Sequence, residues 1–246
     1  MTPIKGISEA RQLPRLGKVR LGIQVEGKTA GKSYPKAVDY FVVPPEVAKV
    51  FGEKPKELRI MFPVENEEDF APQWYRCYSG ARGLICKGDG VMADRCFDKA
   101  TGALATGRSQ ETVRREVGCP GPKCPEIQKK QCRPVMNLMF LLPEVPGLGI
   151  WQLNTSSFYS IRNINSAIEM LKGLLGRIAG VPLVLSVEPQ EVTPEGLKKT
   201  VWTLRLNTTM TLAAIQKLPP PGKVLMPAPE PPESAEAPED LYPEEV

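Results

Sequence analysis

Six cysteines are the residues of this chain with the most specific chemistry. They are Cys77, Cys86, Cys96, Cys119, Cys124 and Cys132, and the chain contains no histidine. Three of them lie within fourteen residues, in the segment CPGPKCPEIQKKQC. In a reducing compartment, clustered thiols more often hold a metal than form disulfides. The lack of histidine excludes Ser-His-Asp and Cys-His catalysis and every histidine-ligated zinc site.

The spacing predicts a structural zinc site with four thiolate ligands. Cys119, Cys124 and Cys132 supply three of them, because proline and glycine between the first two force a tight, non-helical path. Cys86 is the best fourth ligand, since it ends an apolar run and precedes a glycine-rich turn; Cys96 is the alternative. Such a site is closed, so it would hold the chain together and would not activate water. The competing interpretation is a set of reduced structural thiols.

The remaining cysteine and the other polar motifs carry no clear chemistry. Cys77 lies in a strand-like stretch and is interpreted as a small buried hydrophobic residue. Four acids in the segment 65–69 are interpreted as a solvated loop, because neighbouring side chains of an extended chain point in opposite directions. The Gly-Lys-Ser at 31–33 lacks the glycine spacing of a phosphate-binding loop, and the segment 27–33 is expected to be a flexible basic hairpin loop.

Length and charge favour one sizeable domain with a polar tail. The chain has 246 residues and a formal net charge of +4. Residues 219–246 contain nine prolines and seven acids against one lysine, so their net charge is −6 and residues 1–218 carry +10. A segment of this composition buries too little apolar surface to offset its ordering entropy, and we expect it to be disordered. The first 36 residues carry a net charge of +6, which suits either a solvated edge or contact with phosphates.

Hydrophobic periodicity predicts an α+β fold. The pattern indicates one long amphipathic helix from about residue 158 to 179, capped by Asn154, Thr155 or Ser156 and ended by Gly180. It also predicts two shorter helices, at 46–52 and from Thr208 or Thr209 to about 218, and strands at 19–25, 38–43, 58–62, 74–78, 84–86, 135–142, 148–153, 181–187 and 200–206. Strands and helices do not alternate as βαβ units would, so we expect mixed or antiparallel sheets in one domain over residues 1–218, with a cysteine-rich module at about 77–133.

Several long segments resemble one protein family. They are LGIQVEGKTAGKSYPKAVDYFVVP, WYRCYSGARGLICKGDGVMADR, the cysteine block with the following VMNLMFLLPEVPGLGIWQLNTSS, and INSAIEMLKGLLGRIAGVPLVL. This pattern is similar to the recombination directionality factors that actinophages use with large serine integrases. It covers about residues 17–206, and it contains no motif that would assign catalysis.

The resemblance implies a regulator that is not an enzyme. Such a factor binds a large serine integrase on attachment-site DNA and switches it from integration to excision, with little DNA binding of its own. It implies a protein of the bacterial host's cytoplasm, without a membrane partner or a small-molecule substrate. For the integrase contact we single out the cysteine-rich module and nearby aromatic residues, namely Trp74, Tyr75, Tyr78, Lys123 and Arg133. Aromatic residues in strands are also common core residues. The alternative function is a zinc-containing protein that binds single-stranded nucleic acid through its basic face.

Overall fold

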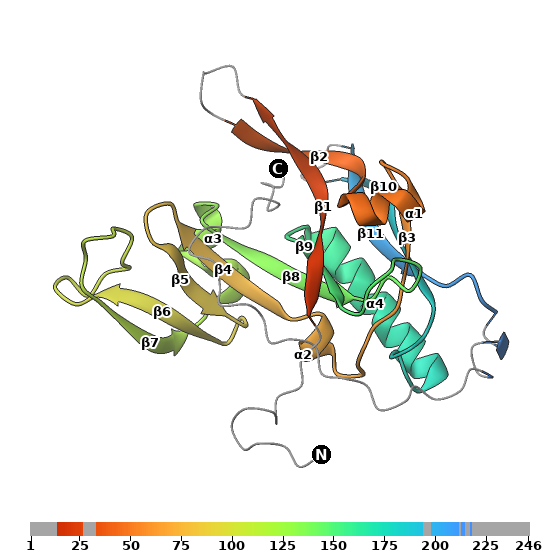
Figure 1. Cartoon of the computed structure of the whole chain (residues 1–246). Helices are drawn as coiled ribbons and strands as arrows, with labels where there is room; N and C mark the ends of the chain where they lie inside the picture. Colours follow the sequence, from red (N-terminus) through yellow and green to blue (C-terminus); the bar gives the residue numbers. More distant parts are fainter. Residues whose placement is uncertain (1–13, 27–32, 194–197, 212, 215–216, 218–246) are drawn as a thin grey trace, which may run out of the picture.

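The computed structural model describes residues 14–26, 33–193, 198–211, 213–214 and 217, and within them it has the expected α+β architecture (Figure 1). The strands are β1 (Arg15–Glu26), β2 (Ser33–Val42), β3 (Glu57–Ile60), β4 (Gln73–Ser79), β5 (Gly83–Gly88), β6 (Met92–Asp98), β7 (Thr112–Gly118), β8 (Cys132–Phe140), β9 (Ile150–Thr155), β10 (Leu183–Val192) and β11 (Lys199–Asn207). The helices are α1 (Pro45–Phe51), α2 (Glu67–Phe70), the 3-10 turn η1 (Gly121–Lys123), α3 (Pro125–Gln128) and the long α4 (Phe158–Leu175).

Two sheets organise these elements. One has eight strands in the order β2-β1-β9-β8-β4-β5-β6-β7, and the other has three in the order β11-β10-β3. Among the described strands, β1 and β9 form the one parallel pair, so the larger sheet is mixed and the smaller antiparallel. Just after β3, Met61 and Leu141 exchange two backbone hydrogen bonds of 3.1 and 2.8 Å, which tie the two sheets together.

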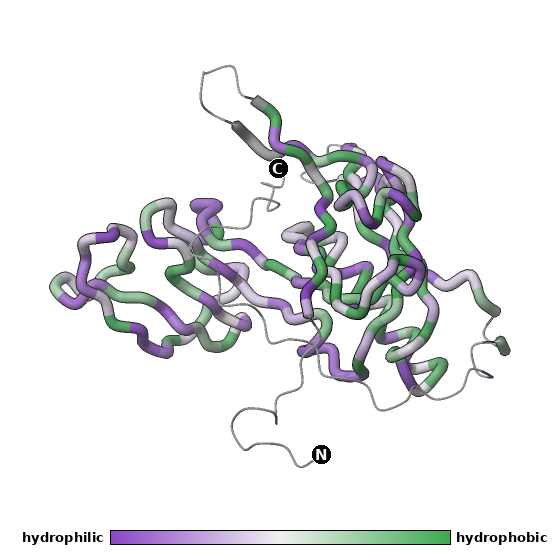
Figure 2. Tube along the Cα trace, in the orientation of Figure 1, coloured by the Kyte–Doolittle hydropathy of each residue, from purple (hydrophilic) through white to green (hydrophobic). Residues whose placement is uncertain are grey.

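The main core lies between the two sheets and α4. Every residue of β9, and the last six residues of β8, are buried, as expected for central strands covered on both faces. From α4, Ile164, Ile168 and Leu171 are almost fully buried in this core, and each such side chain contributes about 1.5–3 kcal/mol. Figure 2 shows that hydrophobic segments are dense around α4 and the strands beside it.

The two ends of α4 differ from the sequence-based expectation. The cap is Ser157, whose hydroxyl oxygen accepts a hydrogen bond from the backbone N–H of Ser160 at 3.3 Å. The predicted cap positions 154–156 were wrong because they are buried at and just after the end of β9. The helix ends at Gly176, with a φ of 68°, and not at Gly180. The buried Ile178 follows the helix in a turn, so its apolar side chain extended the helical pattern too far.

Strands β4–β7 and the segment 119–132, which ends at the first residue of β8, form a part of the molecule that we call the cysteine lobe. In Figure 1 this lobe extends away from α4 and the smaller sheet. Strands β6 and β7 were absent from the sequence-based prediction, because MADRCFD and TVRREVG lack a run of apolar residues alternating with polar ones. They form strands because they pair with their neighbours in the sheet, β6 with β5 and β7 with β6, and their own sequences do not indicate this pairing.

Arg82 organises the long connection between β6 and β7. Its guanidinium group donates hydrogen bonds to the carbonyl oxygens of Gly107, Arg108 and Gln110 at 3.0, 3.1 and 2.5 Å. It also donates to the hydroxyl oxygen of Thr112 at 3.3 Å. One planar group with five donors thus satisfies three carbonyls of the loop.

The acidic segment 65–69 is not simply a solvated loop. The Glu65 carboxylate accepts hydrogen bonds from the backbone N–H groups of Ile178 and Ala179, at 2.9 and 3.0 Å. The carboxylate of Glu67 accepts from the Lys172 ammonium at 2.9 Å. The acids therefore fasten α2 to the end of α4, and the expectation failed because their partners lie more than one hundred residues away along the chain.

Some expectations concern parts of the chain beyond the described residues. The acidic tail 219–246 with its domain boundary, and the basic loop 27–32, lie outside them. Of the last predicted helix, residues 208–211 are not helical, residues 213–214 are helical and residue 217 lies in a turn. The predicted start at Thr208 or Thr209 was therefore wrong, and the other residues of this segment lie outside the described part of the chain. No helix in the described part of the chain is long and apolar enough to cross a membrane.

We predict that Glu65→Gln lowers the free energy of unfolding by about 1–2 kcal/mol, because an amide replaces a carboxylate that accepts two backbone hydrogen bonds. Urea denaturation would measure the change. The matched control is Glu68→Gln, an exposed acid of the same segment. Equal midpoints for the wild type and both variants would contradict the role given to Glu65.

We further predict that Arg82→Lys loosens the β6–β7 connection, because an ammonium group cannot reproduce the forked set of donors. Hydrogen exchange should become faster at residues 99–111, and the free energy of unfolding should fall by about 1–3 kcal/mol. Arg115→Lys, on the exposed side of β7, is the control. Unchanged exchange in the Arg82 variant would show that the loop is held by other contacts.

Candidate metal centre

Three of the six cysteines form a row across neighbouring strands. Cys77 of β4 is the direct partner of Cys132 on β8 and of Cys86 on β5. Residues directly opposite one another in a sheet project from the same face, so these three side chains share one face of the cysteine lobe.

Two more cysteines reach this face from the segment after β7. The backbone N–H of Cys119 donates to the carbonyl oxygen of Val91 at 2.8 Å, which fixes Cys119 beside the β5–β6 turn. Cys124 lies between η1 and α3, and its N–H donates to the carbonyl oxygen of Gly121 at 2.9 Å. Gly121 has a φ of 56°, a conformation that glycine adopts without strain, so the chain turns back sharply between the two cysteines.

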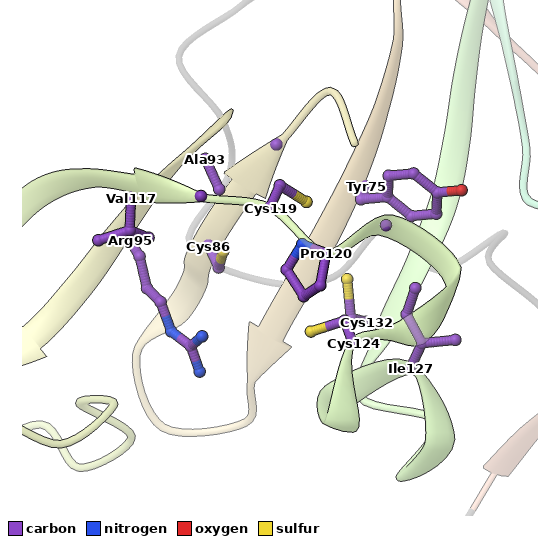
Figure 3. Close-up of a pocket in the computed structure, with 13 residues that line it drawn as sticks. Tyr75, Cys86, Ala93, Arg95, Val117, Cys119, Pro120, Cys124, Ile127 and Cys132 are labelled. Carbon is purple, nitrogen blue, oxygen red and sulfur yellow. The ribbon is translucent and has the colours of Figure 1, made fainter. Parts of the chain in front are cut away.

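One small pocket brings four of these thiols together. Its cavity volume is about 20 Å³, which is enough for a single ion or water molecule and too little for an organic ligand. Figure 3 shows the side chains of Cys86, Cys119, Cys124 and Cys132 around this space, each from a different segment. The pocket is lined by Tyr75, Cys86, Gly88, Ala93, Arg95, Val117, Gly118, Cys119, Pro120, Gly121, Cys124, Ile127 and Cys132.

The four cysteines beside the pocket are those predicted from spacing to bind zinc. The alternative ligand Cys96 does not line the pocket; it is 5% exposed and belongs to the small core of the lobe. Cys77 is 1% exposed and belongs to the same small core. As the side chains stand, however, the described residues contain no group of three or more His, Cys, Asp or Glu side chains that could hold a metal ion. The zinc site therefore stays a prediction.

Glycine is required at one point of the pocket wall. A Cβ atom at Gly88 would lie 2.9 Å from the Cys119 Sγ, 2.9 Å from the Met92 carbonyl oxygen and 2.8 Å from the Ala93 Cβ. Any other residue would therefore clash with its neighbours there. The following turn is closed by Asp89, whose Oδ1 accepts from the N–H groups of Val91 and Met92, both at 2.7 Å.

The buried thiols favour their neutral form. Burial raises the pKa of Cys77 to about 12, with a further increase from the neighbouring thiol of Cys86. Burial also raises the pKa of Cys132 and of Cys86, and the Arg95 guanidinium partly opposes the increase at Cys86. Because the thiolate is the reactive form, these three thiols are poor nucleophiles at neutral pH. Their environment supports a structural role and not covalent catalysis.

Of the described basic residues near the cysteines, Arg95 is the one that lines the pocket. Its Nη2 lies 4.0 Å from a carboxylate oxygen of Glu126 on α3. Its Nε is buried and has no hydrogen-bond partner among the described residues. Arg95 is the direct cross-strand partner of Cys86, so only the strand register could have placed it here.

The five residues singled out for partner contact do not form one surface. Trp74 and Tyr75 are adjacent on β4 and therefore project from opposite faces. Tyr75 lines the pocket, and the Lys87 ammonium lies 4.5 Å from the centre of the Trp74 ring. The other three are the half-buried Tyr78 and Arg133 and the exposed Lys123 of η1.

Comparison with known proteins gives one match. Neither the curated proteins nor the solved structures include a match to this chain. A family model described as recombination directionality factor-like matches residues 16–213, which is most of the chain. The match begins in β1, includes the whole cysteine lobe and α4, and ends beyond β11. The chain therefore belongs to the recombination directionality factor-like family, whose members are typically regulatory proteins and not enzymes.

Proposed function

We propose that this protein binds a large serine integrase on attachment-site DNA and switches it from integration to excision. The observation that carries this proposal is the family match over residues 16–213. Family membership implies an integrase partner in general terms, and the direction of the switch is our inference.

The chemistry of the described residues supports a binding role. The chain has no histidine, and Cys77, Cys86 and Cys132 favour the neutral thiol. The pocket among the cysteines is too small for an organic substrate. A protein with these properties would act through its surface, by choosing between conformations of a partner.

Thermodynamics sets the size of the effect that such a regulator must produce. A factor shifts an equilibrium only by its difference in affinity for the two states. To change the ratio of integrative to excisive arrangements from 99:1 to 1:99, the factor needs about 5.5 kcal/mol of differential binding. A contact surface with several well-ordered apolar and aromatic side chains can supply this amount.

The β5–β6 turn of the cysteine lobe is the surface that we propose for the integrase contact. Val91 and Met92, on the β5–β6 turn, have exposed fractions of 72% and 40%. The carboxylate of Asp89 holds the N–H groups of both residues, and the Val91 carbonyl accepts from Cys119. The apolar side chains are thus presented on a rigid turn, which reduces the entropy lost on binding. The exposed Lys123 lies in the adjoining segment.

We predict that the double variant Val91→Ser/Met92→Ser binds the integrase–DNA complex at least about tenfold more weakly, because it loses two apolar contacts. A mobility-shift assay with the cognate integrase would measure a supershift of integrase–DNA complexes, and an excision assay would measure the switch. Leu148→Ser is the matched control, since Leu148 is 88% exposed on the β8–β9 loop outside the lobe.

Two results of the same assay would count against these proposals. A supershift that the Leu148 variant loses and the double variant keeps would move the contact away from the lobe. Strong, salt-sensitive binding of the wild type to DNA alone, with no effect on the integrase, would replace the proposed function by the nucleic-acid-binding alternative.

A further inference from the structure

The cysteine lobe has a small apolar core. Its core cluster contains five buried residues, of which three are cysteines: Cys77, Ile85, Cys96, Ala105 and Cys132. The main core, in contrast, contains Phe41, Phe62, Phe70 and Phe140, all fully buried. Small units with little apolar burial are commonly stabilised by disulfides or by a structural metal. A cross-link would therefore add to the cohesion that the hydrogen bonds of the sheet already give the lobe.

The positions of four thiols suit a cross-link through one ion. Cys86 lies on β5, Cys119 follows β7, Cys124 joins η1 to α3, and Cys132 begins β8. These segments are separate along the chain, yet all four residues border the same pocket, whose volume suits one ion (Figure 3). An ion bound there would fasten the segment 119–131 to two strands of the sheet at once, β5 through Cys86 and β8 through Cys132.

The surroundings of the pocket suit a metal–thiolate centre. A zinc ion with four thiolates has a net charge of −2, and the guanidinium group of Arg95 lines the pocket with a buried Nε that has no hydrogen-bond partner among the described residues. A cationic donor at this position can offset the charge and donate to sulfur, as groups around metal ligands commonly do. A side chain at Gly88 would crowd the Cys119 Sγ, since its Cβ would lie 2.9 Å from this sulfur.

We propose that Cys86, Cys119, Cys124 and Cys132 bind one structural Zn²⁺ as thiolates. Binding releases four protons to solvent, one from each thiol, and forms four Zn–S bonds. In the structure the side chains do not form a ready group of metal ligands, so binding requires the thiols to converge by rotation about their Cα–Cβ bonds. The proposal goes beyond the regulatory function and does not depend on which partner the protein binds.

Metal content of the full-length protein tests this proposal. We expect one zinc ion per chain after purification without chelator, and a tetrahedral Co²⁺–thiolate absorption spectrum after exchange with cobalt. Removal of the metal by a chelator should lower the melting temperature, because metal binding and folding are linked. A wild type that retains no zinc and takes up neither Zn²⁺ nor Co²⁺ would overturn the proposal.

Single serine variants test the choice of ligands. Cys124→Ser should lose the zinc and the cobalt–thiolate spectrum, whereas Cys96→Ser should keep both, because Cys96 does not line the pocket. If Cys124→Ser fails to fold, the cobalt spectrum and the chelator-induced shift of the wild type still decide whether a site exists. Loss of metal in Cys96→Ser or Cys77→Ser, with full metal in Cys86→Ser, would contradict the proposed ligand set.

The outcome is separable from the proposed function. A zinc-free wild type that still supershifts the integrase–DNA complex would exclude the metal and leave the regulatory function intact. A zinc-loaded protein that does not bind the integrase would support the metal site and exclude the proposed regulatory function.

Discussion

The antiparallel pairing of β4 with β8 is the constraint on which the rest of the structure depends. Strand β8 begins at Cys132 in the cysteine lobe and ends at Phe140, which is fully buried in the main core. Its first half pairs with β4 and its second half with β9, so one strand carries the sheet from the main core into the lobe. The lobe is therefore an extension of the main sheet, and its orientation is set by backbone hydrogen bonds.

The same pairing determines which cysteines can meet. The register of β4 against β8 places Cys77 opposite Cys132, and the register of β4 against β5 places Cys77 opposite Cys86. A slip of one residue in either register would turn one of these side chains to the other face. Local chain geometry brings Cys119 near Cys124, but the meeting of both with Cys86 requires the whole order β8-β4-β5-β6-β7. The pocket is thus a product of topology as well as of spacing.

Sequence reasoning succeeded where the physical signal is local. The apolar runs of β8 and β9 and the three-to-four spacing of α4 reflect burial that neighbouring residues share, and they were predicted. Strands β6 and β7 were not, because charged residues such as Arg114 and Glu116 dominate β7 and its exposed edge needs no apolar face. The role of Glu65 was missed for a related reason. Its carboxylate holds the backbone N–H groups of Ile178 and Ala179, and only the folded chain shows that they are close. For the site, spacing grouped the four cysteines that border the pocket, whereas the strand register determines which of the nearby basic residues, Arg95, lies beside them.

The main core and the cysteine lobe would have different roles in a regulator of this kind: the core stabilises the fold, and the lobe presents the contact surface. A factor that must distinguish two arrangements of a partner needs a surface whose shape does not adapt equally to both, because equal affinity shifts nothing. The turn at Val91 and Met92 has a fixed shape, since hydrogen bonds to Asp89 and Cys119 hold its backbone. Cys119 also borders the pocket, so whatever fixes the cysteines also fixes the turn. The same few backbone contacts would then hold the lobe together and let the protein distinguish the two states of its partner. Loosening the pocket would reduce this selectivity between partner states at a point where the main core is still folded.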